Sequence, residues 1–292
     1  YKQQIHRVML SRKQQQKYLA KRIGEWQTHL QEFTNSHNPE TLHQLRVALK
    51  KLKALARFSK ACSGSNAVKD ANGLKKMFKQ AGIIRDAGNH LHLLEQFHPV
   101  AEPSSQPSSQ PSSPSPSSAQ PSSLPSSVSS SQQYKEQQEQ VQTKATAKFI
   151  RHIKQYRRQG KRAGKRLLAD LDSIPVDCIR DWFALQLVTT GILLTSSGDR
   201  LHKARKQIKD LLYIQKLLPA PAADVLHLDT EYLDKLQDAI GQWHDAAVIV
   251  AAWAGQDSED SPAMTRKCRE KEAAVRHLAK DFYLRAHRTS PR

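Results

Sequence analysis

The sequence is poor in cysteine. Only Cys62, Cys178 and Cys268 occur among 292 residues, and they stand far apart. Without paired spacing they predict neither a disulfide framework nor a zinc site, and we expect a reducing compartment, the cytoplasm. Signatures of a P-loop, of a G-x-S-x-G elbow and of paired carboxylates are also missing. We therefore expect no catalytic residue, no metal ion and no cofactor.

Long hydrophobic runs are missing as well. The longest apolar stretch, residues 183–194, is interrupted by polar side chains and is too short to span a bilayer, so we expect no membrane partner. No secretory signal is visible, but the chain begins at Tyr1 rather than Met, which leaves a removed leader open. Glycine is scarce, and the strict alternation typical of strands is hard to find.

Apolar residues instead recur at spacings of three and four, which predicts an all-helical protein. We expect ten helices, five in each half, with ends placed to within about two to four residues. The expected ranges are 2–34, 39–62, 68–82, 84–98, 134–171, 176–195, 199–218, 226–241, 243–255 and 261–288. Asn38 and Pro39 are expected to open the second of them. Gly82 and Gly241 are expected where one helix stops and the next begins.

Residues 101–133 have a different composition from the rest. Of these 33 residues, 16 are Ser and 7 are Pro, and only Glu102 is charged. Such a segment cannot bury apolar surface, so we predict a disordered insertion. It divides the chain into the core of a first helical repeat (1–100), a long basic helix that completes this repeat (134–171) and a second repeat (172–292).

One phrase occurs twice, 159 positions apart. Residues 42–53 read LHQLRVALKKLK, and residues 201–212 read LHKARKQIKDLL. Two further blocks keep the same offset, LKKMFKQAGIIRDA at 74–87 and LDKLQDAIGQWHDA at 233–246. A constant offset across separated blocks indicates one duplicated structural unit. Its main repeated feature is a row of cations on a helix.

Acidic residues are absent between Glu40 and Asp70, where the first row lies. The row consists of His43, Arg46, Lys50, Lys53 and Arg57. On a helix these positions share one face over about 21 Å, beside a leucine face that packs into a bundle. Like charges at these spacings repel one another, so the row predicts a bound polyanion. We expect Arg46 and Lys50 to face the solvent in a groove.

Two more rows extend this pattern. The second copy carries His202, Arg205, Lys206 and Lys209. The helix after the insertion has ten basic residues and no acidic one between Lys144 and Arg166, including Arg151, Lys154 and Arg158. Any one of these helices alone has the pattern of a solvated basic face. Several of them in one small protein favour a shared anion-binding surface.

His43 and His202 stand at matching positions near the starts of their helices. Each suits either a capping or packing role, or the donation of a hydrogen bond to a phosphate oxygen, which we favour. No second His or carboxylate follows either residue at i+3 or i+4, which disfavours a metal site.

These blocks closely resemble the CHAD family, the conserved histidine α-helical domain. The resemblance covers nearly the whole chain apart from residues 101–133. It implies one domain of two helical bundles related by a pseudo-twofold axis, with a basic groove or pore between them. It also implies that the partner is inorganic polyphosphate, with association with polyphosphate granules and their proteins.

Carried over residue by residue, the resemblance implies a polyphosphate-binding set. Its members are His43, Arg46, Lys50, Lys53, His202, Arg205 and Lys209, with Lys76, Lys79 and Lys235 as weaker ones. The helical rows add Arg57, Lys206, Arg151, Lys154 and Arg158. The second copy departs from the first, because Leu212 stands opposite Lys53 and Asp238 opposite Lys79. We therefore expect the two halves to contribute unequally.

Three alternatives to non-catalytic polyphosphate binding remain. A basic protein can bind nucleic acid weakly at low salt, although the rows contain few aromatic residues for stacking. His244-Asp245 spells the pair found in metal-dependent phosphohydrolases, but the first copy has Arg85-Asp86 there. We interpret both aspartates as structural groups that cap a helix or pair with a neighbouring cation. The third alternative is a module for acidic protein partners.

Overall fold

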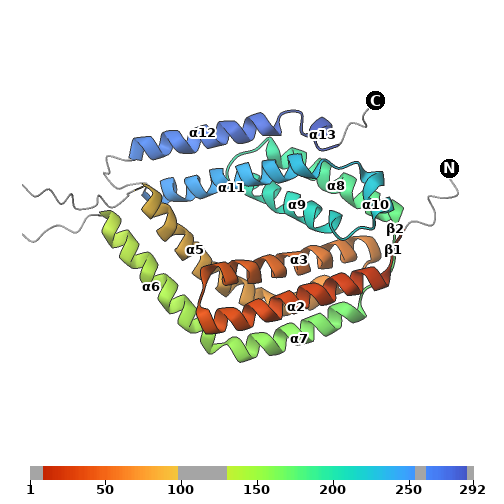
Figure 1. Ribbon diagram of the computed structural model, residues 1–292. Helices are drawn as coiled ribbons and strands as arrows, with labels where there is room; N and C mark the ends of the chain where they lie inside the picture. Colours follow the sequence, from red (N-terminus) through yellow and green to blue (C-terminus); the bar gives the residue numbers. More distant parts are fainter. Residues whose placement is uncertain (1–8, 98–129, 254–260, 288–292) are drawn as a thin grey trace, which may run out of the picture.

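The computed structural model describes residues 9–97, 130–253 and 261–287, and nearly all of them are helical (Figure 1). The first half comprises β1 (Met9–Leu10), α2 (Arg12–Ser36), α3 (Pro39–Ser63), α4 (Ala67–Ala71), the short 3₁₀ helix η1 (Asn72–Leu74), α5 (Lys75–Phe97), α6 (Ser130–Arg151) and α7 (Ile153–Ala169). The second comprises β2 (Ile174–Pro175), α8 (Val176–Leu194), α9 (Asp199–Gln215), α10 (Ala220–Leu226), α11 (Thr230–Trp253), α12 (Ser261–Ala279) and α13 (Phe282–Arg285). The predicted all-helical fold is confirmed.

The start of α3 follows from its sequence. The side chain of Asn38 accepts a hydrogen bond of 2.8 Å from the backbone N–H of Glu40, and Pro39 occupies the first turn. The helix ends at Gly64, which adopts a left-handed conformation with φ 70°. The expected helix 39–62 therefore differs from α3 by a single residue.

The expected breaks at Gly82 and Gly241 are wrong. The helices α5 and α11 run through these glycines without interruption. What precedes α5 is a pair of short turns, α4 and η1, rather than the expected helix 68–82. Similarly, α10 ends at Leu226 and α11 begins at Thr230, where one helix 226–241 was expected.

The long basic helix expected over residues 134–171 is divided at His152. The His152 ring nitrogen lies 2.8 Å from the carbonyl oxygen of Lys148, and its backbone N–H donates to Phe149, one residue short of the α-helical partner. Of the insertion expected over 101–133, residues 101–129 lie outside the described residues. Residues 130–133 belong to α6, which begins earlier than predicted.

The helices pack in consecutive pairs, α2 with α3 and α5 with α6 in the first half, α8 with α9 and α11 with α12 in the second. Figure 1 shows α3 and α9 converging near the two strands. The helices α5 and α11 approach each other at the opposite end of the molecule. The strands pair antiparallel, Met9 with Pro175 and Leu10 with Ile174. This pairing joins the beginnings of the two halves.

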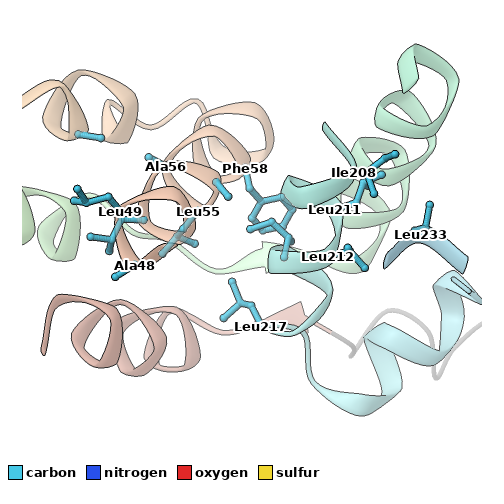
Figure 2. Packing of buried hydrophobic residues seen from close by; sticks show 14 of the residues in the cluster. Ala48, Leu49, Leu55, Ala56, Phe58, Ile208, Leu211, Leu212, Leu217 and Leu233 are labelled. Atoms are coloured by element: carbon cyan, nitrogen blue, oxygen red, sulfur yellow. The ribbon is translucent and has the colours of Figure 1, made fainter. Parts of the chain in front are cut away.

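One hydrophobic core contains side chains from both halves. Figure 2 shows side chains of this core from both helices, among them Leu55 and Phe58 of α3 and Leu211 of α9. The Phe58 ring meets the Trp182 ring of α8 edge to face, with 5.1 Å between centroids. The crossing of α3 and α9 is thereby fixed by packing, which holds their cationic rows in place. Among the described helices, none has the length and apolar character of a membrane span.

Candidate anion-binding cleft

A cleft of about 1020 Å³ lies between α3, α5, α8, α9 and α11. Nine Lys or Arg side chains line it against three Asp, so its net charge is positive. Eight expected site residues are among the lining groups, namely Arg46, Lys50, Lys53, Arg57, His202, Arg205, Lys206 and Lys209. The cationic rows of α3 and α9 therefore come together in one space.

Arg46 and Arg205 hold equivalent positions in the two halves. Nη1 of Arg46 donates to the Phe78 carbonyl at 3.1 Å, and Nε of Arg205 donates to the Gln237 carbonyl at 3.0 Å. Each acceptor lies 32 residues after its arginine, so the duplication extends to contacts between helices. Arg46 is only 8% exposed. The expectation that it faces the solvent is wrong, because it joins α3 to α5.

The two glycines inside helices make room for these arginines. A Cβ at Gly82 would lie 2.8 Å from Nη1 of Arg46, and a Cβ at Gly241 would lie 2.5 Å from Nη2 of Arg205. Both distances are too short for a carbon atom beside a nitrogen. A Cβ at either position would displace the arginine, so these glycines allow a close approach and do not, as predicted, end a helix.

Asp86 and Asp245 also line the cleft, one turn after the glycines. Burial lowers the pKa of Arg46, and the negative charge of Asp86 opposes that shift. Asp245 acts on the pKa of Arg205 in the same way. The interpretation that each aspartate accompanies a cation fits this geometry. The alternative of a helix cap is wrong, because both lie inside helices.

The lysines are held close to other cations. The pKa of Lys50 is lowered to about 7, chiefly by burial and then by the positive charges of Lys209 and Arg46. Burial also lowers the pKa of Lys53 to about 8, with Arg57 as the next cause. Cations whose charge is disfavoured in this way lack a compensating anion, and a bound anion would supply one.

His202 and His244 form a pair in the cleft. Their ring centroids are 4.2 Å apart, and Nδ1 of His202 is buried without a hydrogen-bond partner among the described residues. Burial lowers the pKa of His202 to about 4, and His244 is the second cause. His43, the counterpart of His202, is half-buried on α3 outside the cleft lining. Burial, then Arg85, lowers its pKa as well.

The two sides of the cleft differ in charge. Arg57 forms a bidentate ion pair with Asp210, with N–O distances of 2.6 and 2.9 Å. In the duplication Arg57 corresponds to Lys216, and Asp210 corresponds to Lys51. Asp210 therefore has no acidic counterpart in the first half. Positive charge surrounds Lys53, whereas Asp238 and Asp234 act on Lys209. The two halves thus contribute unequal positive charge to the cleft, as expected, and the α3 side is the more basic.

A model of the CHAD domain matches residues 17–254. The chain belongs to the CHAD domain family. A solved structure, the CHAD domain from the plant Ricinus communis, is similar over 95% of this chain and 93% of that chain, with a TM-score of 0.60. The two sequences are 16% identical, so this likeness concerns the fold alone. Among curated proteins, no sequence matches this chain.

Several expected residues of this CHAD domain lie outside the cleft lining. They are His43, Lys76, Lys79, Arg151, Lys154, Arg158 and Lys235. Lys235 bonds to Glu231 at 2.7 Å on the outer surface. The helix α7 packs against α2 and η1, and Figure 1 shows α2 and α3 between α7 and the second half. The cations of α7 therefore face a different part of the surface.

Arg85 and His244 are two of the groups in the cleft that the site prediction missed. Both belong to the helices opposite the cationic rows, α5 and α11. A signal was present in the sequence, because the offset of 159 aligns Arg85 with His244 beside the repeated aspartate. Within the described part of the chain, no group of three or more His, Cys, Asp or Glu side chains could hold a metal ion.

Proposed function

We propose that this CHAD domain binds inorganic polyphosphate in the cleft and catalyses no reaction on it. The observation that carries the proposal is the environment of Lys50. Its ammonium group is largely buried near Lys209, Arg46 and Arg85, and its pKa is lowered to about 7. Such a cluster is unfavourable in the free protein and becomes favourable when a polyanion occupies the cleft.

The arrangement suits a linear anion better than a single phosphate. The cationic positions follow α3 from Arg46 to Arg57, which corresponds to about 16 Å of helix. A phosphate chain along this line would replace its mobile counterions with fixed Lys and Arg groups. Lysines would act as point charges. Each arginine would bind phosphate through those guanidinium N–H groups that do not donate to the carbonyl of Phe78 or Gln237.

Single-stranded nucleic acid suits the cleft less well, since binding it usually requires free aromatic faces on which bases stack. Phe78 lines the cleft, but the guanidinium of Arg46 lies 4.6 Å from its ring centroid and the ammonium of Lys53 lies 4.0 Å from it. These cations cover the Phe78 ring, which leaves Tyr213 as the other Phe, Tyr or Trp ring in the cleft lining. We therefore expect nucleic acid to bind weakly, and mainly at low salt.

Calorimetric titration with long-chain polyphosphate at about 150 mM salt tests the proposal, with single-stranded DNA as the competing polyanion. The informative variant is Lys53→Gln with Lys206→Gln, which removes two charges from the cleft. Its matched control is Lys154→Gln with Arg158→Gln, which removes two exposed charges from α7. We expect a large loss of affinity in the first variant and little change in the second.

Equal losses in both variants would show that overall charge, and not the cleft, determines binding. Failure of the parent protein to bind polyphosphate, or equal affinity for DNA, would overturn the proposed function.

Incubation of the complex with added divalent metal should release no phosphate. In cells, a fluorescently labelled chain should collect at polyphosphate granules, and the cleft variant should spread through the cytoplasm.

A further inference from the structure

The outer face of α8 is apolar and exposed. Leu185, Val188 and Ile192 are 61%, 48% and 55% exposed, respectively. Their spacing of three and four residues places them on one stripe along the helix, the pattern of the seam between two paired helices. Beside the stripe, the Tyr283 hydroxyl of α13 donates to the Val188 carbonyl at 3.1 Å.

The first half shows how the corresponding helix is covered. The helix α2, like α8, follows a strand and precedes the helix with the cationic row. Its outer face is buried under α7, where Gly164 allows Ile23 to pack closely and Gly160 receives the ring of Trp26. Trp26 is consequently 1% exposed. In the second half, the four-residue α13 contacts α8 at Gly191 and leaves the stripe open.

Charge restricts what can cover this stripe. Residues 182–198 contain no charged side chain, although the whole chain carries a formal charge of +19. Two copies of the chain would repel each other wherever their basic surfaces met, and they can approach most easily at an uncharged face. An apolar stripe is also self-complementary, which is what a twofold contact between identical chains requires.

We propose that two copies of this chain associate through α8, antiparallel across a twofold axis near Val188. The adjacent face of α8, rotated by about 100° from the stripe, supplies Gln186 and Thr189 to the cleft, so the contact lies beside each cleft. Such a dimer would place two cationic clefts near each other, and one polyanion could then occupy both. The dimer itself needs no polyanion, so its test is independent of the proposed function.

Sedimentation velocity of the ligand-free protein, from micromolar to submillimolar concentration, tests the proposal. We expect a dimer that strengthens as salt screens the repulsion between copies. The variant Leu185→Glu with Ile192→Glu should be monomeric, with helicity by circular dichroism unchanged because both side chains are exposed. The control Val141→Glu introduces an acid at an apolar position of α6 that is 36% exposed and should leave the dimer intact.

A covalent trap locates the contact. Val188→Cys should form a disulfide-linked dimer under mild oxidation, because an antiparallel pairing brings this position close to its own copy. Val141→Cys, which retains the same three native cysteines, should not. A parent protein that is monomeric at all concentrations, or a dimer that survives the double glutamate variant, would overturn the proposal.

Discussion

The guanidinium of Arg205 lies directly against the backbone of Gly241, so that a Cβ at that glycine would lie 2.5 Å from Nη2 and 3.0 Å from Nε. Arg46 and Gly82 repeat this relationship in the first half. A glycine inside a helix costs about 1 kcal/mol relative to alanine. Its presence at both positions is explained by the arginine that it accommodates.

Replacing Gly241 with alanine should therefore displace Arg205. The gain in helix propensity, about 1 kcal/mol, should be offset by the weakened hydrogen bond to Gln237, which contributes about 1–3 kcal/mol. The control is Gly24→Ala in α2, where a Cβ meets no atom within 4 Å and only the gain applies. Chemical denaturation measures the free energy of unfolding of both variants. Equal stabilisation of the two variants would contradict a requirement for glycine.

Neutralising Asp210 should strengthen polyanion binding. In Asp210→Asn, Arg57 loses its bidentate partner and becomes available to phosphate, while the cleft loses one negative charge. The free energy of unfolding should change by no more than about 1 kcal/mol, because the pair is partly exposed and the burial that raises the pKa of Asp210 opposes the gain from the pair. Calorimetry should give a several-fold higher affinity and a steeper dependence on salt. An unchanged or lower affinity would mean that Arg57 takes no part in binding.

The stability of the ligand-free protein should increase with pH above neutrality. The pKa of Lys50 is about 7 in the folded protein and 10.5 ordinarily, so the unfolded chain binds more protons between these values. The destabilising contribution of Lys50 is therefore complete below about pH 7 and is relieved as the pH rises towards 10.5. Thermal denaturation at pH 7, 8 and 9 measures this slope, which should diminish in Lys50→Met.

Polyphosphate affinity should change with pH in the opposite direction. A bound polyanion favours the charged form of Lys50 and raises its pKa, so binding takes up protons. Affinity should be highest near pH 7 and fall as the pH rises through 8 and 9, with Lys53 adding to the decline from about pH 8. Calorimetric titrations with polyphosphate in buffers of different ionisation enthalpy measure the number of protons taken up on binding. An affinity that is constant over this range would contradict the assigned environment of Lys50.

Removing the Lys50 charge should stabilise the free protein and weaken its binding of polyphosphate. In Lys50→Met the repulsion from Lys209 and Arg46 disappears, and the free protein should gain about 1 kcal/mol. Polyphosphate should bind more weakly, because a central cation is lost. Lys154→Met on the exposed side of α7 should alter stability by no more than about 0.5 kcal/mol. A destabilised Lys50→Met protein would show that Lys50 makes favourable contacts in the absence of an anion.

The sequence predicted the all-helical fold class, the range of α3 and the cationic rows of α3 and α9, because these depend on local periodicity. The range of α3 follows from the 3.6-residue repeat and its start signal, whereas the groove between the two halves was implied by the resemblance to the CHAD family. The same periodicity could not separate the cations of α7 from those of α3. A charged helix face has the same pattern whether it borders a cleft or bulk solvent.

The errors arose where a residue's role depends on a distant contact. Gly82 has the pattern of a helix end in the sequence, and only the position of Arg46 shows that it serves a close approach. Arg46 itself was placed in the solvent because its carbonyl partner, on α5, is 32 residues away. His152 divides α6 from α7 through one side-chain contact that periodicity does not record.

The antiparallel pairing of Met9–Leu10 with Ile174–Pro175 has a consequence for any attempt to divide the protein. Leu10 and Ile174 are fully buried, and each strand has its partner strand in the other half. A chain consisting of one repeat would keep an unsatisfied strand edge and would expose the apolar side of α3 or α9. We therefore expect a single repeat to be unstable on its own and the pair of repeats to be the smallest unit that folds.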